Sequence, residues 1–472
     1  MKTTFKKITY LFLFLGLSLN SFSGNIEDLV AACKKGDLAA AQKAIDAGAD
    51  VNAKDAEGWY PIVAAVFSPQ ITQLLLDKKA DPNIGTTPAL ANAAGQGSYE
   101  VMQLLLKAGA DPNKPIIVDG TAAYKKLLED EKAKGKTANK FMIKAYEDLI
   151  AKAGTAKAPS VYAIQSVVNR TLCKECLELL IEKGAKTDLI NPDSQNNLLH
   201  DLAISALSPS EWIQNNKAQV EGWEKLGFIL PDWYKNPDVK KLSSADAMVK
   251  PLVKAGVNIN AENKLKDTPL LSALSKPNQN SSDVVIAFVN NGANVNVEGM
   301  GYKGHALLQA AGLGFVDVLE AMLAKGADMN MEFKVNDATT GQRLKGITPL
   351  MWAARNGKAG AVKLLCEKGA KIDEAAYGNS FNIKTNCMTT VKNKTAIYYA
   401  IEGENLDVIK YLVENTKGIW NTKLIVDQWK KEREDAYFTY QNCISDRDYK
   451  PSEYAKACGM TEIADYLKSK NL

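Results

Sequence analysis

Apolar side chains recur along the chain with the spacing of short amphipathic helices. In 101–109, 176–184 and 362–369 they fall at positions i, i+3 and i+4, which places them on one face of a helix. Each segment ends at a glycine, a residue that readily takes the left-handed conformation that ends a helix. These segments are therefore predicted to be helices that each bury a single face.

A second kind of segment begins with Thr-Pro, at Thr87, Thr268 and Thr348, and continues as a run rich in Leu, Ala or both. Threonine caps a helix because its side-chain oxygen accepts a hydrogen bond from a free backbone N–H. Proline fits the first turn because its missing N–H is not needed there. The small alanines allow a second helix to pack closely. Each Thr-Pro segment thus predicts the first helix of a two-helix unit.

The turn after each helix pair also repeats, as Gly-Ala-Asp-x-Asn or a close variant, about 30 to 36 residues apart where nothing is inserted. The copies lie at 48–52, 80–83, 109–113, 256–260, 292–296 and 326–330, with weaker ones at 184–188 and 369–373. The aspartates recur once per unit. They are expected to bond nearby backbone N–H groups rather than to form paired catalytic carboxylates.

In its period and in both signatures the chain resembles the ankyrin-repeat family. The resemblance covers nearly all of residues 24–472. It implies an all-α solenoid of about eleven helix-turn-helix units with short hairpin loops, including a degenerate fourth unit over 116–154. Such repeats bind other proteins on their concave surface and rarely catalyse reactions, so the resemblance implies a non-enzymatic protein-protein interaction scaffold.

Two aromatic-rich insertions, at about 208–243 and 418–448, break the repeat, and an elongated loop is expected over 375–394. The insertions hold five of the seven tryptophans. Solenoid insertions often lie on the binding face, where aromatic residues are enriched. The competing interpretation is that they pack into local cores on the solenoid flank. The candidate partner-binding residues are Trp59, Tyr60, Trp212, Trp223, Trp233, Tyr234, Trp352, Trp420 and Trp429.

The N-terminus has the pattern of an export signal. Three lysines precede an apolar run of about a dozen residues, 8–19, and small residues at Ser21 and Ser23 suit a signal peptidase. The run is too short to span a bilayer comfortably. We therefore expect a signal peptide over 1–23 and a mature chain that is periplasmic or secreted. The Lys- and Asn-rich composition favours a bacterial source.

Composition and charge argue against other classes of partner. The 472 residues are 46% hydrophobic and 24% charged, which is typical of a folded chain. Removal of residues 1–23 takes away three lysines and leaves a formal net charge of +1. Only five of the 58 basic residues are Arg, the side chain preferred for bidentate contacts with phosphates and bases. We expect a protein partner, no nucleic acid, no membrane span after cleavage, and a monomer.

Residues suited to catalysis are few. The resemblance implies that His200 is structural, with its ring bridging neighbouring loops, and His305 stands where a helix cap belongs. These are the two histidines of the sequence. The sequence holds no glycine-rich phosphate loop, nucleophile elbow or EF-hand loop. No catalytic residue, metal ligand or cofactor is predicted.

The cysteines leave one alternative open. Cys173 and Cys176 form a Cys-x-x-Cys pair before a predicted helix, where the pKa of a thiol is lowered. A redox role therefore competes with core or loop cysteines and with a structural disulfide. A zinc site would need a second such pair. Cys387 and Cys443, both in extra segments, are a further candidate disulfide.

The sequence therefore favours an extracytoplasmic scaffold that binds a protein partner on its concave repeat surface, on the insertion aromatics, or on both. The alternatives are a thiol redox protein acting through Cys173 and Cys176, an unrecognised hydrolase in an insertion, and a secreted effector that acts on proteins of another cell.

Overall fold

The structure is a computed structural model. It describes residues 26–117, 121–137, 139–155, 160–170, 173–205, 209–237, 243–275, 282–297, 305–337, 342–382, 387–420, 423–427 and 447–472. The expected signal peptide, 1–23, lies outside this part of the chain. The chain divides into two compact units: an N-terminal lobe (1–189 with 205–256) and a C-terminal lobe (190–204 with 257–472).

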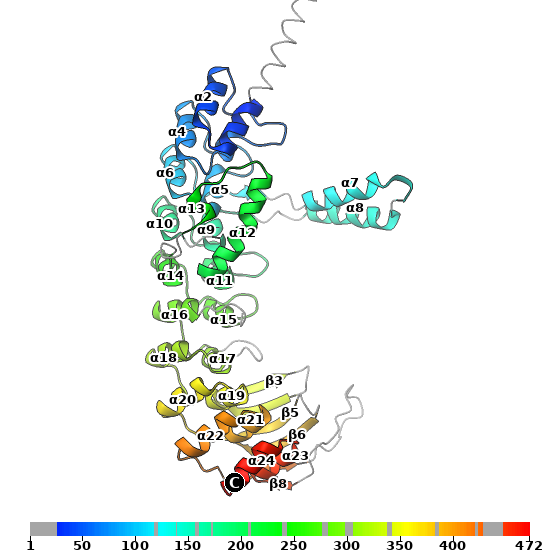
Figure 1. The fold of residues 1–472 in the computed structure, drawn as a ribbon, viewed down its shortest axis with the longest axis vertical. Helices are drawn as coiled ribbons and strands as arrows, with labels where there is room; N and C mark the ends of the chain where they lie inside the picture. The colour runs from blue at the N-terminus through cyan, green and yellow to red at the C-terminus, as the bar shows by residue number, and fades with distance from the viewer. Residues whose placement is uncertain are drawn as a thin grey trace, which may run out of the picture. The chain divides into compact units, whose positions relative to one another are not determined.

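The N-terminal lobe is built from pairs of short helices (Figure 1). In chain order the stacked helices are one over 26–35, α2 (Leu38–Asp46), α3 (Pro61–Ala64), α4 (Pro69–Asp77), α5 (Ala89–Gln96), α6 (Tyr99–Lys107), α9 (Ala163–Arg170), α10 (Lys174–Glu182) and α14 (Ala245–Lys254). Their buried residues form the predicted apolar stripe, as Val101, Met102 and Leu105 do in α6. Burial of this stripe against neighbouring helices holds the stack together.

The described residues of 116–154 form a helical hairpin, at the place where a degenerate fourth repeat is predicted from the sequence. Its elements are β1 (Ile116–Ile117), α7 (Ala122–Ala133), the short 3-10 helix η1 (Gly135–Thr137) and α8 (Lys140–Thr155), and β1 pairs with β2 (Ser160–Val161). Helices α7 and α8 pack on each other, while α9 packs directly on α5. The charged sequence of α7 offers no broad apolar face to a neighbouring repeat, so the count of eleven units is not confirmed.

The C-terminal lobe continues the helix pairs. Its helices are α11 (Leu198–Ser205), α15 (Pro269–Leu274), α16 (Ser282–Asn290), α17 (Ala306–Leu313), α18 (Val316–Ala324), α19 (Pro349–Arg355), α20 (Ala359–Glu367), α21 (Ala396–Glu402), α22 (Leu406–Asn415), α23 (Pro451–Ala457) and α24 (Thr461–Ser469). Thr268 and Thr348 accept the predicted capping bonds at α15 and α19. His305 caps α17 by accepting from the N–H of Leu307, which confirms its expected role.

A six-stranded antiparallel sheet in the C-terminal lobe was not predicted. Its strands, in spatial order, are β3 (Phe333–Asp337), β4 (Gln342–Ile347), β5 (Ala376–Asn382), β6 (Cys387–Lys394), β7 (Leu424–Asp427) and β8 (Arg447–Tyr449). The β5–β6 hairpin occupies the stretch expected to be an elongated loop. Each hairpin precedes the first helix of a repeat, and β4–β5 and β6–β7 pairing joins successive hairpins. The predicted helical solenoid is confirmed for the repeats. The sheet is formed by the long loops that connect them.

The recurring asparagine joins each turn to the next. Asn83 donates from Nδ2 to the carbonyl of Gly109 (2.9 Å), and its Oδ1 accepts from the N–H of Asp111 (2.8 Å). The same two bonds to the following turn are made by Asn52, Asn113, Asn260 and Asn296. As predicted, the turn aspartates bond the N–H two residues on, namely Asp50, Asp81, Asp111 and Asp328. The turns thus form a hydrogen-bonded ladder within each lobe.

Candidate partner-binding site

The insertion at 208–243 forms helix α12 (Pro209–Lys225) and the short helix α13 (Asp232–Lys235), both in the N-terminal lobe (Figure 1). Most of its described aromatics pack inward. Phe228, Leu230 and Tyr234 form a buried cluster against Trp59, Phe67 and Trp223. Ring centroids are 4.8 Å apart for Trp223–Phe228, 5.5 Å for Trp59–Phe228 and 5.0 Å for Phe67–Tyr234. These residues therefore form a local core between the insertion and the first repeats.

Hydrogen bonds of Tyr234 hold α13 in place. The Tyr234 hydroxyl lies 2.5 Å from Oε1 of Gln96, the last residue of α5, and donates to it. Asn216 of α12 donates from Nδ2 to the Tyr234 carbonyl (2.7 Å). Burial raises the pKa of Tyr234 to about 12, so the hydroxyl remains a donor at neutral pH. The backbone of the neighbouring Trp233 is therefore fixed relative to the repeat.

Trp233 points outward, unlike Tyr234. It is 49% exposed and lines a hollow of about 480 Å³. The walls come from the start of α4, the start of α6 and the segment that leads into α13. The lining residues are Phe67, Pro69, Gln70, Gly97, Ser98, Tyr99, Glu100, Val101, Pro231 and Trp233. This preformed hollow has aromatic and proline walls, which suit an apolar side chain of a ligand.

Ser98 gives the hollow a polar group. It is buried, and its Oγ has no hydrogen-bond partner among the described residues. Ser98 is the N-cap residue of α6, but its side chain does not cap the helix. A buried hydroxyl without a partner is costly, and this oxygen has almost no solvent-accessible surface. The site thus combines an apolar pocket with one unsatisfied hydroxyl.

The other candidate aromatics lie elsewhere. Tyr60 is half-buried against Gly85. Trp352 of α19 is half-buried against Gly312, with the Arg355 guanidinium 5.4 Å from its ring centroid. Trp420 is buried. The Trp212 side chain and all of Trp429 lie outside the described residues.

Several residues of the hollow, among them Phe67, Ser98 and Pro231, were not predicted from the sequence. None of them belongs to a recognisable motif, and the hollow joins segments more than 130 residues apart in the sequence. Trp233 was the one lining residue named in advance. Its neighbours in the insertion, Trp223 and Tyr234, contribute to the core instead.

The histidines and cysteines have defined positions. His200 is buried, and its Nε2 donates to the carbonyl of Asp267 (2.9 Å) in the next repeat, which confirms that the ring bridges loops. Burial lowers the pKa of His200. Cys173 and Cys176 form a disulfide. The Cys387 side chain and all of Cys443 lie outside the part of the chain that the structure describes.

Within the described ranges, no group of three or more His, Cys, Asp or Glu side chains is arranged to hold a metal ion. None of the helices for which the structure gives a placement is both long enough and apolar enough to cross a membrane.

Comparison with known proteins agrees with the repeat architecture. A sequence model of the family described as ankyrin repeats (3 copies) matches residues 29–116 and 331–423. Ankyrin repeat and SOCS box protein 3 from Homo sapiens is 31% identical over 101 residues, and the same protein from Bos taurus is 30% identical. Each match covers 20% of this chain. The match covers 20% of the human protein and 19% of the bovine protein, so the chain spans about a fifth of the length of these relatives. With the helix pairs and the asparagine ladder, these matches show that the chain is an ankyrin-repeat protein.

Proposed function

We propose that this protein is an extracytoplasmic scaffold that holds a protein partner by an apolar side chain seated in the hollow beside Trp233. Ankyrin repeats generally mediate protein–protein interaction and are typically non-enzymatic. The observation that carries the proposal is the half-exposed Trp233 on the wall of a preformed hollow of about 480 Å³. Aromatic residues at well-packed pockets are typical binding hot spots.

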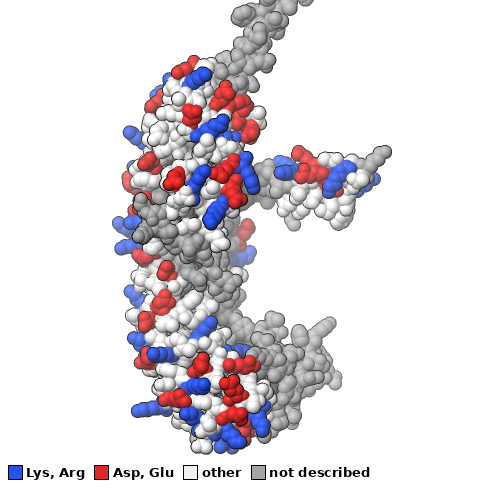
Figure 2. All heavy atoms as spheres, viewed as in Figure 1, with Lys and Arg blue, Asp and Glu red and all other residues white. Residues whose placement is uncertain are grey.

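Rigidity and charge support the same proposal. Because the Tyr234 hydrogen bonds and the aromatic core fix α13, little conformational entropy is lost when a partner binds beside it. On the face shown in Figure 2, Lys and Arg side chains are interspersed with Asp and Glu over both lobes. The hollow itself offers shape and apolar area to a partner.

The export part of the proposal is supported by the N-terminal pattern of three lysines and an apolar run. If residues 1–23 are a signal peptide, the protein made in its own cells should be found in the periplasm or the medium, shortened by about 23 residues. Fractionation followed by mass spectrometry of the mature N-terminus measures this. A full-length chain recovered from the cytoplasm would contradict export. Release into the medium would favour the alternative of a secreted effector, which would bind its partner by the same kind of contacts.

The Trp233→Ala variant tests the binding site. A photo-crosslinking amino acid at Gln70, an exposed residue that also lines the hollow, first identifies the partner, and the affinity of that purified protein is then measured by calorimetry. Loss of a hot-spot tryptophan is expected to weaken binding by about 30-fold or more, because a hot-spot residue is worth about 2 kcal/mol. Since Trp233 is half-exposed, the melting temperature should change little.

Ile229→Ala is the matched control. Ile229 is 62% exposed and belongs to the same insertion, but it does not line the hollow. Its replacement should leave the affinity within about twofold, as expected for a residue outside the hot spot. Equal affinities of the wild type and Trp233→Ala would refute the site.

A further inference from the structure

We propose that Cys173 and Cys176 form a thiol–disulfide exchange site that oxidises pairs of thiols in a protein substrate, with the Cys173 sulfur as the atom attacked. This activity goes beyond partner binding and does not depend on the hollow beside Trp233. It rests on the position of the two sulfurs at the start of a helix and on their unequal exposure.

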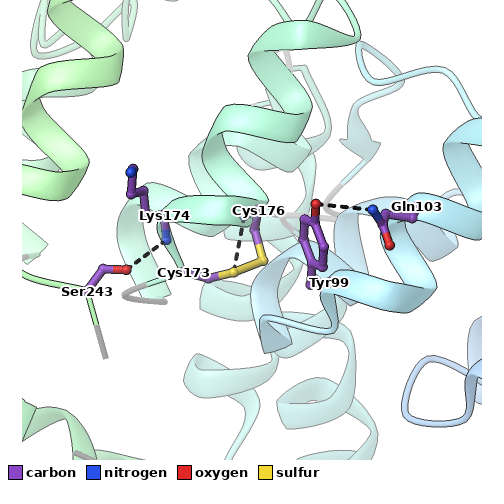
Figure 3. The surroundings of a disulfide bond; sticks show 6 residues. All are labelled: Tyr99, Gln103, Cys173, Lys174, Cys176 and Ser243. Carbon is purple, nitrogen blue, oxygen red and sulfur yellow. Dashed lines mark hydrogen bonds between the residues drawn. A yellow bond between two sulfur atoms is a disulfide. The ribbon is translucent and has the colours of Figure 1, made fainter. Parts of the chain in front are cut away.

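The two cysteines have different surroundings. Cys173 is the N-cap residue of α10 and is half-buried, whereas Cys176, in the first turn, is fully buried. Their sulfurs are bonded to each other (Figure 3). Tyr99 of α6 and Ser243 flank the pair in that view. Of the two sulfurs, that of Cys173 is therefore the one that an incoming thiolate can reach.

The backbone stabilises negative charge on Cys173. The N–H of Cys176 donates to the Cys173 sulfur at 3.2 Å, which is the capping bond of α10. After reduction the same N–H would bond a thiolate, and the positive end of the helix dipole favours that charge. A stabilised thiolate is a better leaving group and shifts the equilibrium towards the reduced pair. The geometry thus makes the disulfide an oxidant.

A purely structural disulfide is poorly suited to this position. Cross-links stabilise a fold mainly when they close long loops, and this one closes a loop with two residues between the cysteines. Other hydrogen bonds already hold the start of α10. The N–H of Lys174 donates to Ser243 Oγ (3.1 Å), and the N–H of Leu177 donates to the Cys173 carbonyl (3.2 Å). Reduction is therefore expected to leave the repeat folded.

The free cysteines of the described residues are not expected to take part in disulfide exchange. Burial raises the pKa of Cys33 to about 12 and those of Cys366 and Cys458 to about 11. Their thiols remain protonated at neutral pH, and a thiol is a far weaker nucleophile than a thiolate. Exchange is therefore expected to centre on the Cys173–Cys176 pair.

The reaction balances without a further reagent. A substrate thiolate attacks the Cys173 sulfur, the Cys173–Cys176 bond breaks, and Cys176 leaves as a thiolate that takes up a proton. The second thiolate of the substrate then attacks the substrate sulfur of the mixed disulfide. This forms the substrate disulfide and releases Cys173 as a thiolate. Two electrons pass from the substrate dithiol to the pair. The products are one substrate disulfide and two protein thiols.

The test uses the purified full chain and a synthetic peptide that carries two cysteines. Oxidised protein should convert about one equivalent of peptide dithiol to disulfide, as measured by mass spectrometry. The Cys176→Ser variant, incubated with glutathione disulfide, should form a mixed disulfide at Cys173 and release one glutathione thiol, because its Cys173 thiolate attacks the glutathione disulfide and no second protein cysteine resolves the product. Its Cys173 should also react with iodoacetamide with a midpoint below pH 8.5, the ordinary pKa of a free thiol. Cys366→Ser is the matched control and should behave as the wild type.

Three results would overturn the proposal. The first is a pair that stays oxidised in millimolar reduced glutathione, and the second is an alkylation midpoint at or above pH 8.5 in Cys176→Ser. The third is loss of helical circular dichroism on reduction, which would mark the disulfide as structural. If Cys176→Ser fails to fold, titration of the wild type with glutathione still decides the question, because an exchange-active pair must be reducible within that buffer.

Discussion

Replacing Glu402 by alanine is expected to lower the free energy of unfolding of the C-terminal lobe by about 3–5 kcal/mol, because removal of one partner leaves a buried charge uncompensated. The Lys394 side chain is 0% exposed, and its Nζ lies 2.6 Å from Glu402 Oε1. The ammonium also lies 4.5 Å from the centre of the Tyr399 ring. Burial lowers the pKa of Lys394, and the Glu402 carboxylate opposes that shift.

The carboxylate also links two repeats. The Tyr454 hydroxyl of α23 donates to Glu402 Oε1 of α21 (2.8 Å). Glu402→Ala therefore removes the counter-ion of Lys394 and the hydrogen-bond acceptor of Tyr454 together. The loss should appear in urea unfolding followed by circular dichroism, as a lower midpoint for the transition of this lobe.

Glu414→Ala is the matched control for Glu402. Glu414 pairs with Lys470 at 3.1 Å, but both side chains are partly exposed, so solvent screens this pair and Glu414→Ala should leave the urea midpoint close to that of the wild type. The double variant Lys394→Met/Glu402→Leu should recover much of the loss, because both charges are then absent. A Glu402→Ala effect no larger than that of Glu414→Ala would show that the buried pair is not important for stability.

Replacing Phe228 by alanine is expected to destabilise the N-terminal lobe by about 3–5 kcal/mol, the usual range for a buried phenylalanine. Phe228 is 3% exposed, and its ring lies between those of Trp59, Trp223 and Phe67. Its loss leaves a cavity at the centre of the core that attaches the insertion to the first repeats. Urea unfolding measures the loss, and tryptophan fluorescence should report freed Trp59 and Trp223.

Phe141→Ala is the control for Phe228. Phe141 lies on α8 and is exposed, so its removal should change the stability by less than about 0.5 kcal/mol. If Phe228→Ala were equally mild, the insertion would not be held by this core. The same result would weaken the argument that Trp233 is rigidly positioned, because α13 is fixed through the same cluster.

Sequence alone was enough for the repeat because its signals are local. The glycine that ends a helix, the threonine that caps one and the aspartate that closes a turn all act within four residues, as at Thr348 and Asp81. Recurrence of these signals then identified the repeated unit. The count of eleven units stays a prediction, because the charged α7 satisfies helix propensity without an apolar face to stack.

The tertiary structure decided which aromatic residues are buried. Trp233 and Tyr234 are adjacent and equally suited to a binding surface by type, yet Tyr234 bonds Gln96, 138 residues away, and Trp233 lines the hollow. Likewise, pairing of successive hairpins produced the sheet. Local sequence specifies helices and turns because their bonds are short in range. Burial, pairing and the candidate site depend on contacts between distant segments, which exist only once the repeats have stacked.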